Sequence, residues 1–260
     1  MSSISRHQKY SENSGAHVQG SRARYPLVDV LRGLAVLFMV VYHFSFDLNY
    51  FHQVHIDFYH DAFWLGFRTF IVTLFLLLVG VSLHLATRFG FERRRYLRRL
   101  GLLACCAALV SLGSYLVFPA RMIYFGILHF IFVASLLGLL MLRYYWINLF
   151  AGLGLIILGW RLQHPLFDLP ALQWVGMMTH KPLTEDYVPL LPWFGVVMIG
   201  LFLGRRFFNE SWALLGRWQG QRHWQRLMAL GGRHSLLIYM VHQPLLLGLL
   251  YLLVGETVKS

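Results

Sequence analysis

The chain has 260 residues, of which 57% are hydrophobic and 13% are charged, and its formal net charge is +12. An ordinary soluble domain carries about 25% charged residues, so this composition argues against a soluble fold. The positive charge would suit nucleic-acid binding, but the arginines stand in short segments between long apolar blocks, as in the cytoplasmic loops of membrane proteins. We therefore expect an all-α, polytopic transmembrane helical bundle that contacts the lipid bilayer and binds no nucleic acid.

Residues 1–24 are polar and rich in Ser, Gly, His and Arg, which predicts a disordered cytoplasmic tail. The first apolar block follows this tail, contains Asp29 and Arg32, and lacks a small-residue cleavage site. We interpret this block as a retained span and not as a signal peptide. Residues 25–260 are then predicted to form a single transmembrane domain.

Long apolar blocks recur through the rest of the chain, and a membrane-spanning helix needs about 20 mostly apolar residues. A stretch that mixes Trp and Leu with Arg, at 211–232, predicts a helix lying on the inner membrane surface. Gly195, Gly200 and Gly204 predict close packing of the span that contains them. The seven predicted spans cover residues 26–46, 62–87, 100–118, 123–142, 145–160, 189–204 and 234–254.

The distribution of Lys and Arg predicts which ends of these spans face the cytoplasm. Seventeen of the 23 Lys and Arg residues fall in the tail and in the second, fourth and sixth loops, and four fall on the opposite side. The remaining two, Arg32 and Arg68, lie within spans. Because cytoplasmic loops carry an excess of Lys and Arg, we expect the N-terminus inside and the C-terminus outside.

The first predicted span carries four ionisable residues on one face. At about 100° per residue, Asp29, Arg32, His43 and Asp47 fall within an arc of about 60°. Each ionisable group in a span costs roughly 2.5–3.5 kcal/mol on insertion scales, so such groups rarely persist there without a partner or a role. This polar stripe predicts a functional site; the alternative is that its members only pair with polar groups on neighbouring helices.

The spacing within the stripe indicates specific chemistry. His43 and Asp47 stand at i,i+4, where helix side chains meet. Asp47 would accept a hydrogen bond from one imidazole nitrogen and leave the other as a general base. Arg32 lies about 16 Å away, toward the inner end. It is expected either to pair with Asp29 at i,i+3 or to bind a phosphate or carboxylate that enters from the cytoplasm.

Other polar residues in or beside the spans are weaker candidates. Arg68 is predicted to face the bundle interior, whereas His129, at mid-span, and His242 fit a packing role as well as a functional one. The first outer loop is rich in histidine, including His55 and His60, and such loops can bind metal. Their spacing matches no defined zinc pattern and no Cys accompanies them, so we expect no metal site there.

Several stretches resemble a known family. The run VDVLRGLAVLFMVVYHFSFDLNYF resembles the start of the heparan-alpha-glucosaminide N-acetyltransferase catalytic-domain family, in its small bacterial branch. MIYFGILHFIFVASLL, DYVPLLPWFGVVMIGLFLGR and RHSLLIYMVHQPLLL fit the same branch. The resemblance implies a multi-pass protein of the bacterial inner membrane that moves an acetyl group from cytoplasmic acetyl-CoA to an amino sugar on the far side.

Arg32 and His43, with ten residues between them, also resemble the Arg–His signature of membrane acyltransferase family three. This resemblance implies that His43 is the catalytic histidine and Arg32 its supporting cation. In the lysosomal relative, however, an asparagine matches His43, and the proposed active histidine lies in the next outer loop. Counting back from Gly80 places that histidine near His60, and counting forward from His43 places it near His55, so the choice stays open.

Residues and resemblance together predict an integral membrane N- or O-acyltransferase with acetyl-CoA as donor and a carbohydrate acceptor at the outer face, and they leave a homo-oligomer open. A transporter or lipid-handling protein is the alternative, because intramembrane His, Asp and Arg also build proton relays. A structural subunit would need none of the stripe. The predicted catalytic residues are His43, Asp47 and His60, and the predicted substrate-binding residues are Asp29, Arg32, Arg68, His129 and His242, with Arg32 and His129 also candidates for stabilising an oxyanion.

Overall fold

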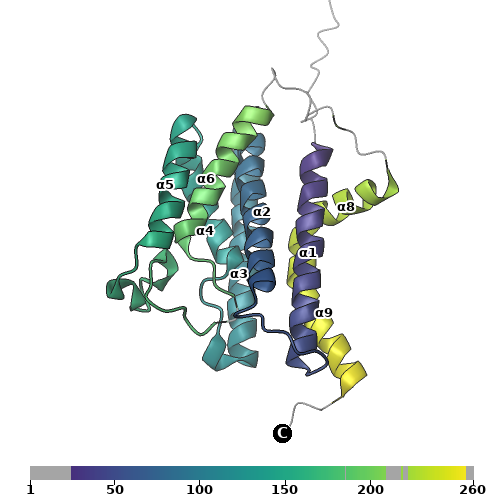
Figure 1. Cartoon of the computed structure of the whole chain (residues 1–260). Helices are drawn as coiled ribbons and strands as arrows, with labels where there is room; N and C mark the ends of the chain where they lie inside the picture. The colour runs from purple at the N-terminus through teal and green to yellow at the C-terminus, as the bar shows by residue number, and fades with distance from the viewer. Residues whose placement is uncertain (1–24, 185, 209–217, 219–221, 256–260) are drawn as a thin grey trace, which may run out of the picture.

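The computed structural model of the chain is a bundle of helices that lie side by side (Figure 1), and it describes residues 25–184, 186–208, 218 and 222–255. These residues form helices and short 3₁₀ turns and no β-strand, which confirms the all-α prediction. The predicted disordered tail at 1–24 lies outside the described residues. The helices are α1 (Pro26–Tyr50), α2 (Ala62–Thr87), α3 (Arg93–Val117), α4 (Ile127–Met141), α5 (Trp146–Arg161), α6 (Leu190–Phe207), α8 (His223–Arg233) and α9 (Ser235–Val254), with 3₁₀ turns η1 (Pro119–Arg121), η2 (Pro165–Asp168) and η3 (Gln173–Val175).

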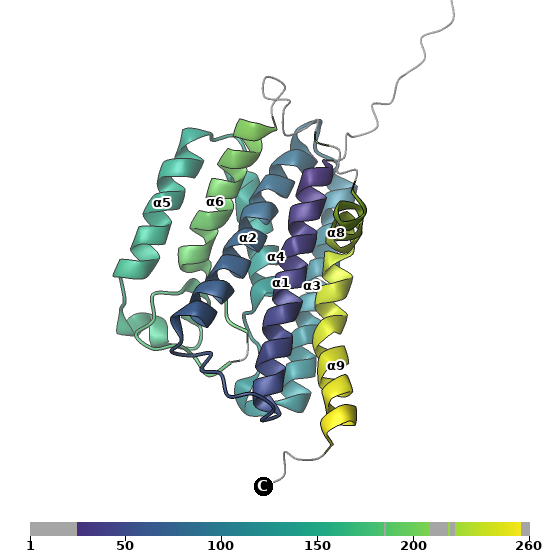
Figure 2. The ribbon, with the colours of Figure 1, turned by 45° about the vertical axis from the view of Figure 1, so that its right-hand side comes forward.

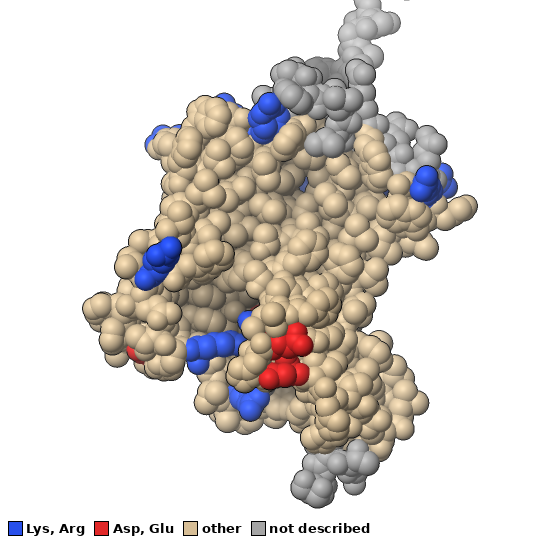
Figure 3. Space-filling view, in the orientation of Figure 1, with Lys and Arg blue, Asp and Glu red and all other residues tan. Residues whose placement is uncertain are grey.

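The helices have the length and surface of a membrane protein. By length and composition, α1, α2, α3, α6 and α9 are able to cross a membrane, whereas α4 and α5 are apolar but shorter. Large apolar side chains stand exposed on several of them, for example Leu252 at 83% and Leu116 at 71%. Figure 3 shows a face with few charged side chains and broad uncharged surface between them. The polytopic helical membrane fold is therefore confirmed, and the count of seven spans stays a prediction.

Local sequence explains where the helices begin. α1 starts with Pro26, whose missing N–H lies in the first turn, where it would have no partner within the helix. The Asp61 side chain caps α2 by accepting from the Phe63 backbone N–H at 2.7 Å. α3 begins at Arg93 instead of residue 100, because the basic run continues the helix beyond its apolar part. α3 thus includes charged turns at its start that a prediction from hydropathy leaves out.

α1 packs against α2, α8 and α9, and α8 crosses it at a steep angle near its start (Figures 1 and 2). The approach is very close: a Cβ on Gly33 would overlap the Met228 carbonyl, and one on Gly232 would overlap the Asp29 carbonyl. A transverse helix agrees with the prediction for 211–232, of which only Trp218 and the residues from 222 onward are described. α8 therefore fixes the end of α1 that carries Asp29.

α6 occupies the middle of the other half of the bundle, between α2 and α5. A Cβ on Gly200 would overlap the Leu77 carbonyl, and a Cβ on Gly204 would lie 3.1 Å from the His84 Cβ. The predicted close packing through these glycines is confirmed. We call the end at which α1 begins and α2 ends the basic end, defined by Arg88, Arg93, Arg143, Arg205 and Arg206.

Candidate active site

The polar stripe of α1 faces neighbouring helices. Asp29 and Asp47 are buried, with 7% and 2% of their surfaces exposed, and Arg32 and His43 are partly buried. Their side chains contact α2, α8 and α9 and divide into two clusters along α1. The inner cluster surrounds Asp29 near the basic end, and the outer cluster surrounds His43 in the opposite half.

In the inner cluster, Asp29 lies between two arginines. Arg32 Nη1 lies 3.4 Å from Asp29 Oδ1, and Arg233 Nε, from α8, lies 3.4 Å from Asp29 Oδ2. Arg32 Nη2 also donates to Ser82 Oγ on α2 at 2.6 Å. The structure therefore contains the i,i+3 pair that the spacing allowed, and it adds Arg233 and Ser82, which sequence reasoning missed because they come from distant segments.

The outer cluster brings together two histidines from helices far apart in sequence. The rings of His43 and His242 lie edge to face, with centroids 4.9 Å apart. His43 Nδ1 lies 2.9 Å from the Met39 carbonyl oxygen, and His242 Nδ1 lies 2.6 Å from the Tyr239 carbonyl oxygen. A carbonyl only accepts, so each neutral imidazole carries its proton on Nδ1 and presents an unprotonated Nε2.

The predicted hydrogen bond between Asp47 and His43 is wrong. His43 donates to its own helix, and Asp47 Oδ1 instead accepts from Gln243 Nε2 at 2.8 Å. The i,i+4 spacing permits contact, but the Met39 carbonyl one turn back competes for the same imidazole proton. Asp47 Oδ2 and Gln243 Oε1 are both buried without a hydrogen-bond partner among the described residues. Two acceptor oxygens are thus unsatisfied beside the histidine pair.

Asp186 is a half-buried carboxylate that sequence reasoning did not select, although it stands just before a predicted span. Its Oδ2 accepts from the Ile127 backbone N–H at 2.8 Å and from the Tyr239 hydroxyl at 3.2 Å. Burial raises its pKa, and these donors partly offset that effect. Because Tyr239 lies one turn before His242 on α9, Asp186 fixes the part of α9 that presents the second histidine.

His129 lies in the first turn of α4, not at mid-span as predicted, because α4 begins only at Ile127. Its Nδ1 accepts from the Gly126 backbone N–H at 3.3 Å, which places the proton on Nε2. Nε2 lies 3.0 Å from Ser111 Oγ, and that hydroxyl donates to the Ile123 carbonyl. Nδ1 therefore caps α4 itself and Nε2 joins α4 to α3, and the use of both ring nitrogens favours the packing role.

The remaining predicted residues lie away from the histidine pair. His60 is exposed and its Nδ1 lies 2.9 Å from Asp57 Oδ2, while His55 is also exposed. Arg68 on α2 interacts with the Tyr42 hydroxyl on α1, so it faces the bundle as predicted. The part of the chain that the structure describes holds no group of three or more His, Cys, Asp or Glu side chains placed to hold a metal ion.

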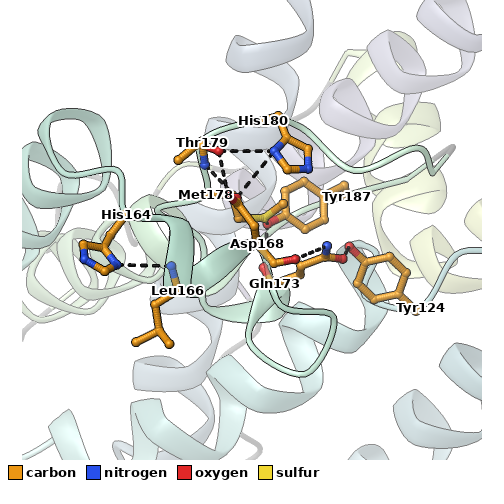
Figure 4. Close-up of polar contacts among 9 residues, drawn as sticks. All are labelled: Tyr124, His164, Leu166, Asp168, Gln173, Met178, Thr179, His180 and Tyr187. Carbon is orange, nitrogen blue, oxygen red and sulfur yellow. Dashed lines mark hydrogen bonds and ion pairs between the residues drawn. The ribbon is translucent and has the colours of Figure 1, made fainter.

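The loop between α5 and α6 is ordered by its own polar contacts (Figure 4). Asp168 accepts from the Thr179 backbone N–H at 2.9 Å and from its hydroxyl at 2.6 Å, and these bonds lower the pKa of the carboxyl. Gln173 accepts from the Tyr124 hydroxyl at 2.6 Å, and its carbonyl accepts from Tyr187. The loop thus forms a fixed cover over the outer ends of α4 and α6, and it holds Asp186 in place.

Comparison with known families identifies the chain. The family model described as heparan-alpha-glucosaminide N-acetyltransferase, catalytic, matches residues 24–244. The chain belongs to this family. Heparan-alpha-glucosaminide N-acetyltransferase relatives are enzymes, so the fold described above is that of a membrane acetyltransferase. Comparison with curated proteins and with solved structures found no match. The matched range contains both clusters of α1 and the α9 residues His242 and Gln243.

Proposed function

We propose that the protein transfers an acetyl group from acetyl-CoA, at the basic end, to a sugar or amino sugar at the opposite face of a bacterial inner membrane. The observation that carries this proposal is the His43–His242 pair, which offers an unprotonated Nε2 in the half of α1 opposite to Arg32 and Arg233. Family membership supplies the reaction class. The positive charge of the basic end supports a cytoplasmic orientation for that end.

His43 acts as the general base in this mechanism. Its Nε2 removes a proton from the acceptor amine or hydroxyl while that nitrogen or oxygen attacks the thioester carbonyl carbon. The new C–N or C–O bond forms, the C–S bond breaks, and the thiolate of CoA leaves and takes up the proton from Nε2, which restores the neutral imidazole. The Met39 carbonyl holds the reactive tautomer throughout, because it accepts the Nδ1 proton at 2.9 Å. Base assistance of this kind contributes about 10²–10⁴ in rate.

Asp47 and Gln243 bind the acceptor in this proposal. Their unsatisfied Oδ2 and Oε1 atoms are both acceptors, and a buried polar atom without a partner costs about 1–3 kcal/mol. An amine or hydroxyl group of the acceptor supplies the missing donors. The same contacts orient the attacking atom toward His43, which stands one turn before Asp47 on α1.

Replacing Asp47 with asparagine tests this role. The Asp47→Asn variant is expected to raise the acceptor KM about 10-fold or more, because a hydrogen bond to a charged group contributes roughly 1.5–3 kcal/mol. The KM for acetyl-CoA should change little. Steady-state kinetics with each substrate varied in turn measures both values, and the exposed Asp57→Asn serves as the matched control. Equal changes in both KM values would remove Asp47 from the acceptor site.

Arg32 is proposed to attract the phosphates of acetyl-CoA at the basic end. The Arg32→Gln variant is expected to raise the KM for acetyl-CoA by about 10-fold, since charge-assisted bonds to phosphate are the strong ones. Arg161→Gln, at the far end of α5, is the control. Thermal unfolding of both variants separates lost binding from lost packing against Asp29. An unchanged KM in a folded variant would limit Arg32 to its pairing role.

The most direct test of the reaction class uses purified protein with acetyl-CoA and a panel of amino sugars. Release of free CoA that depends on both the protein and an amino sugar is the expected result. A transporter, the competing class, would move a sugar across vesicle membranes without acetyl-CoA and would release no CoA. Such flux without CoA release would replace the acetyltransferase proposal.

A further inference from the structure

A pocket lies at the basic end, away from the His43 cluster. It has a volume of about 560 Å³ and lies between the ends of α2 and α4. Its basic lining residues are His84, Arg88 and Arg143, and its apolar ones are Phe91, Leu139 and Leu142. No lining residue is acidic. The pocket therefore combines positive charge with an aliphatic and aromatic wall.

The two arginines of this pocket have polar and aromatic neighbours. The Arg88 guanidinium donates to the Tyr25 hydroxyl at 2.9 Å and to the Phe208 carbonyl. The Arg143 guanidinium lies 4.6 Å from the Tyr144 ring centroid, and no ion pair of Arg143 is found within the described ranges. His84 Nε2 is buried there without a hydrogen-bond partner from any described residue. An anionic oxygen in the pocket would meet the positive charge of Arg88 and Arg143.

The apolar wall is continuous with the lipid-facing surface of the bundle. Leu139 and Leu142 belong to the end of α4, where the neighbouring Leu140 is 65% exposed. Phe91, on the loop after α2, is 50% exposed. An aliphatic chain that lies along α4 would enter the pocket from the side. Basic pockets between transmembrane helices near the cytoplasmic side are suited to anionic lipid head groups.

We propose that this pocket binds an anionic phospholipid of the inner leaflet. Its phosphate lies against Arg143 and Arg88, and the upper part of its acyl chain packs on Leu139 and Leu142. Acetyl-CoA also carries phosphates, but the aliphatic wall and its continuity with exposed α4 favour a lipid. The proposal goes beyond acetyl transfer, because the site contains none of the residues assigned to the reaction.

The test measures lipid retained by the full-length protein. We would purify it, exchange it into nanodiscs that contain phosphatidylglycerol in a phosphatidylcholine background, and record bound lipid by native mass spectrometry. Wild type is expected to retain phosphatidylglycerol over phosphatidylcholine, and Arg143→Gln should weaken that retention about 10-fold. Arg161→Gln, at the opposite end of the bundle, is the matched control and should retain lipid as wild type does.

A second variant keeps the charges and fills the space. Leu139→Trp should also reduce phosphatidylglycerol retention, whereas the control Leu136→Trp, on the exposed face of α4, should not. Retention unchanged in both Arg143→Gln and Leu139→Trp would overturn the proposal. Displacement of the lipid by micromolar acetyl-CoA would also overturn it, in favour of a donor site. Acetyl transfer is not the readout, so failure here is distinguishable from failure of the proposed reaction.

Discussion

The His43→Ala variant is expected to lose acetyl transfer by about 10²–10⁴-fold while it folds and inserts normally. The ring of His43 supplies an unprotonated Nε2 beside Asp47 and Gln243. His242 has the same tautomer, but its Nε2 is buried, so we assign the role of base to the partly buried His43. His43 is only partly buried, so its loss leaves a small defect in packing. Acetylated product formed at saturating acetyl-CoA measures the effect, and thermal unfolding in detergent reports the fold.

Matched histidine variants separate the alternatives that the family resemblance leaves open. His55→Ala and His60→Ala remove exposed imidazoles of the outer loop, and both variants should keep near wild-type rates. His242→Ala should give an intermediate loss, because it removes the ring that packs against His43 at 4.9 Å. A large loss in His60→Ala or His55→Ala, with activity retained in His43→Ala, would transfer the role of base to the outer loop.

Introducing a single methyl group at Gly33 is expected to destabilise the bundle strongly. The Cβ of Gly33→Ala would overlap the Met228 carbonyl, so α1 and α8 must separate. The Met228 carbonyl belongs to the backbone, and the position of the added Cβ is fixed by the backbone of α1, so no side-chain rotation relieves the overlap. Overpacking of this kind costs about 1–3 kcal/mol. The separation also pulls Arg233 from Asp29. A lower midpoint of thermal unfolding, together with reduced activity, is the expected result.

Gly113 provides the control, because the same glycine-to-alanine change is expected to have the opposite effect on stability there. It lies on the exposed side of α3, and nothing stands within 4 Å of an added Cβ. Glycine within a helix costs about 0.5–1 kcal/mol relative to alanine, so Gly113→Ala should leave the unfolding midpoint unchanged or raise it. If Gly33→Ala behaved in the same way, the close crossing of α1 and α8 would be contradicted.

Hydropathy predicts most of the fold. α2 begins and ends at the predicted residues, and α1, α5, α6 and α9 lie within a few residues of prediction. α3 and α4 differ more. The Arg-rich run extends α3 to Arg93, and Gly126 delays α4 to Ile127. The apolar content of the sequence does not predict where these two helices begin. A helix continues beyond its apolar part wherever its backbone hydrogen bonds continue.

The candidate site is predictable only in part. The polar stripe on α1 follows from helical periodicity, and in the structure its members Asp29 and Asp47 are buried against neighbouring helices. The residues that contact the stripe cannot be predicted in the same way. α9 is apolar on nearly all sides, so its sequence does not determine which face it turns toward α1. Gln243 stands beside the selected His242 and could have been chosen as a polar residue in a span. Arg233 and Ser82 carry no such local signal.

In the proposed mechanism, His43 enables acetyl transfer between opposite sides of the membrane. The most direct test uses sealed proteoliposomes with labelled acetyl-CoA outside and glucosamine trapped inside. We expect labelled acetylglucosamine to accumulate inside with wild-type protein and to stay at the protein-free level with His43→Ala. Product that forms only when both substrates share one compartment, or equal accumulation with His43→Ala, would contradict this mechanism.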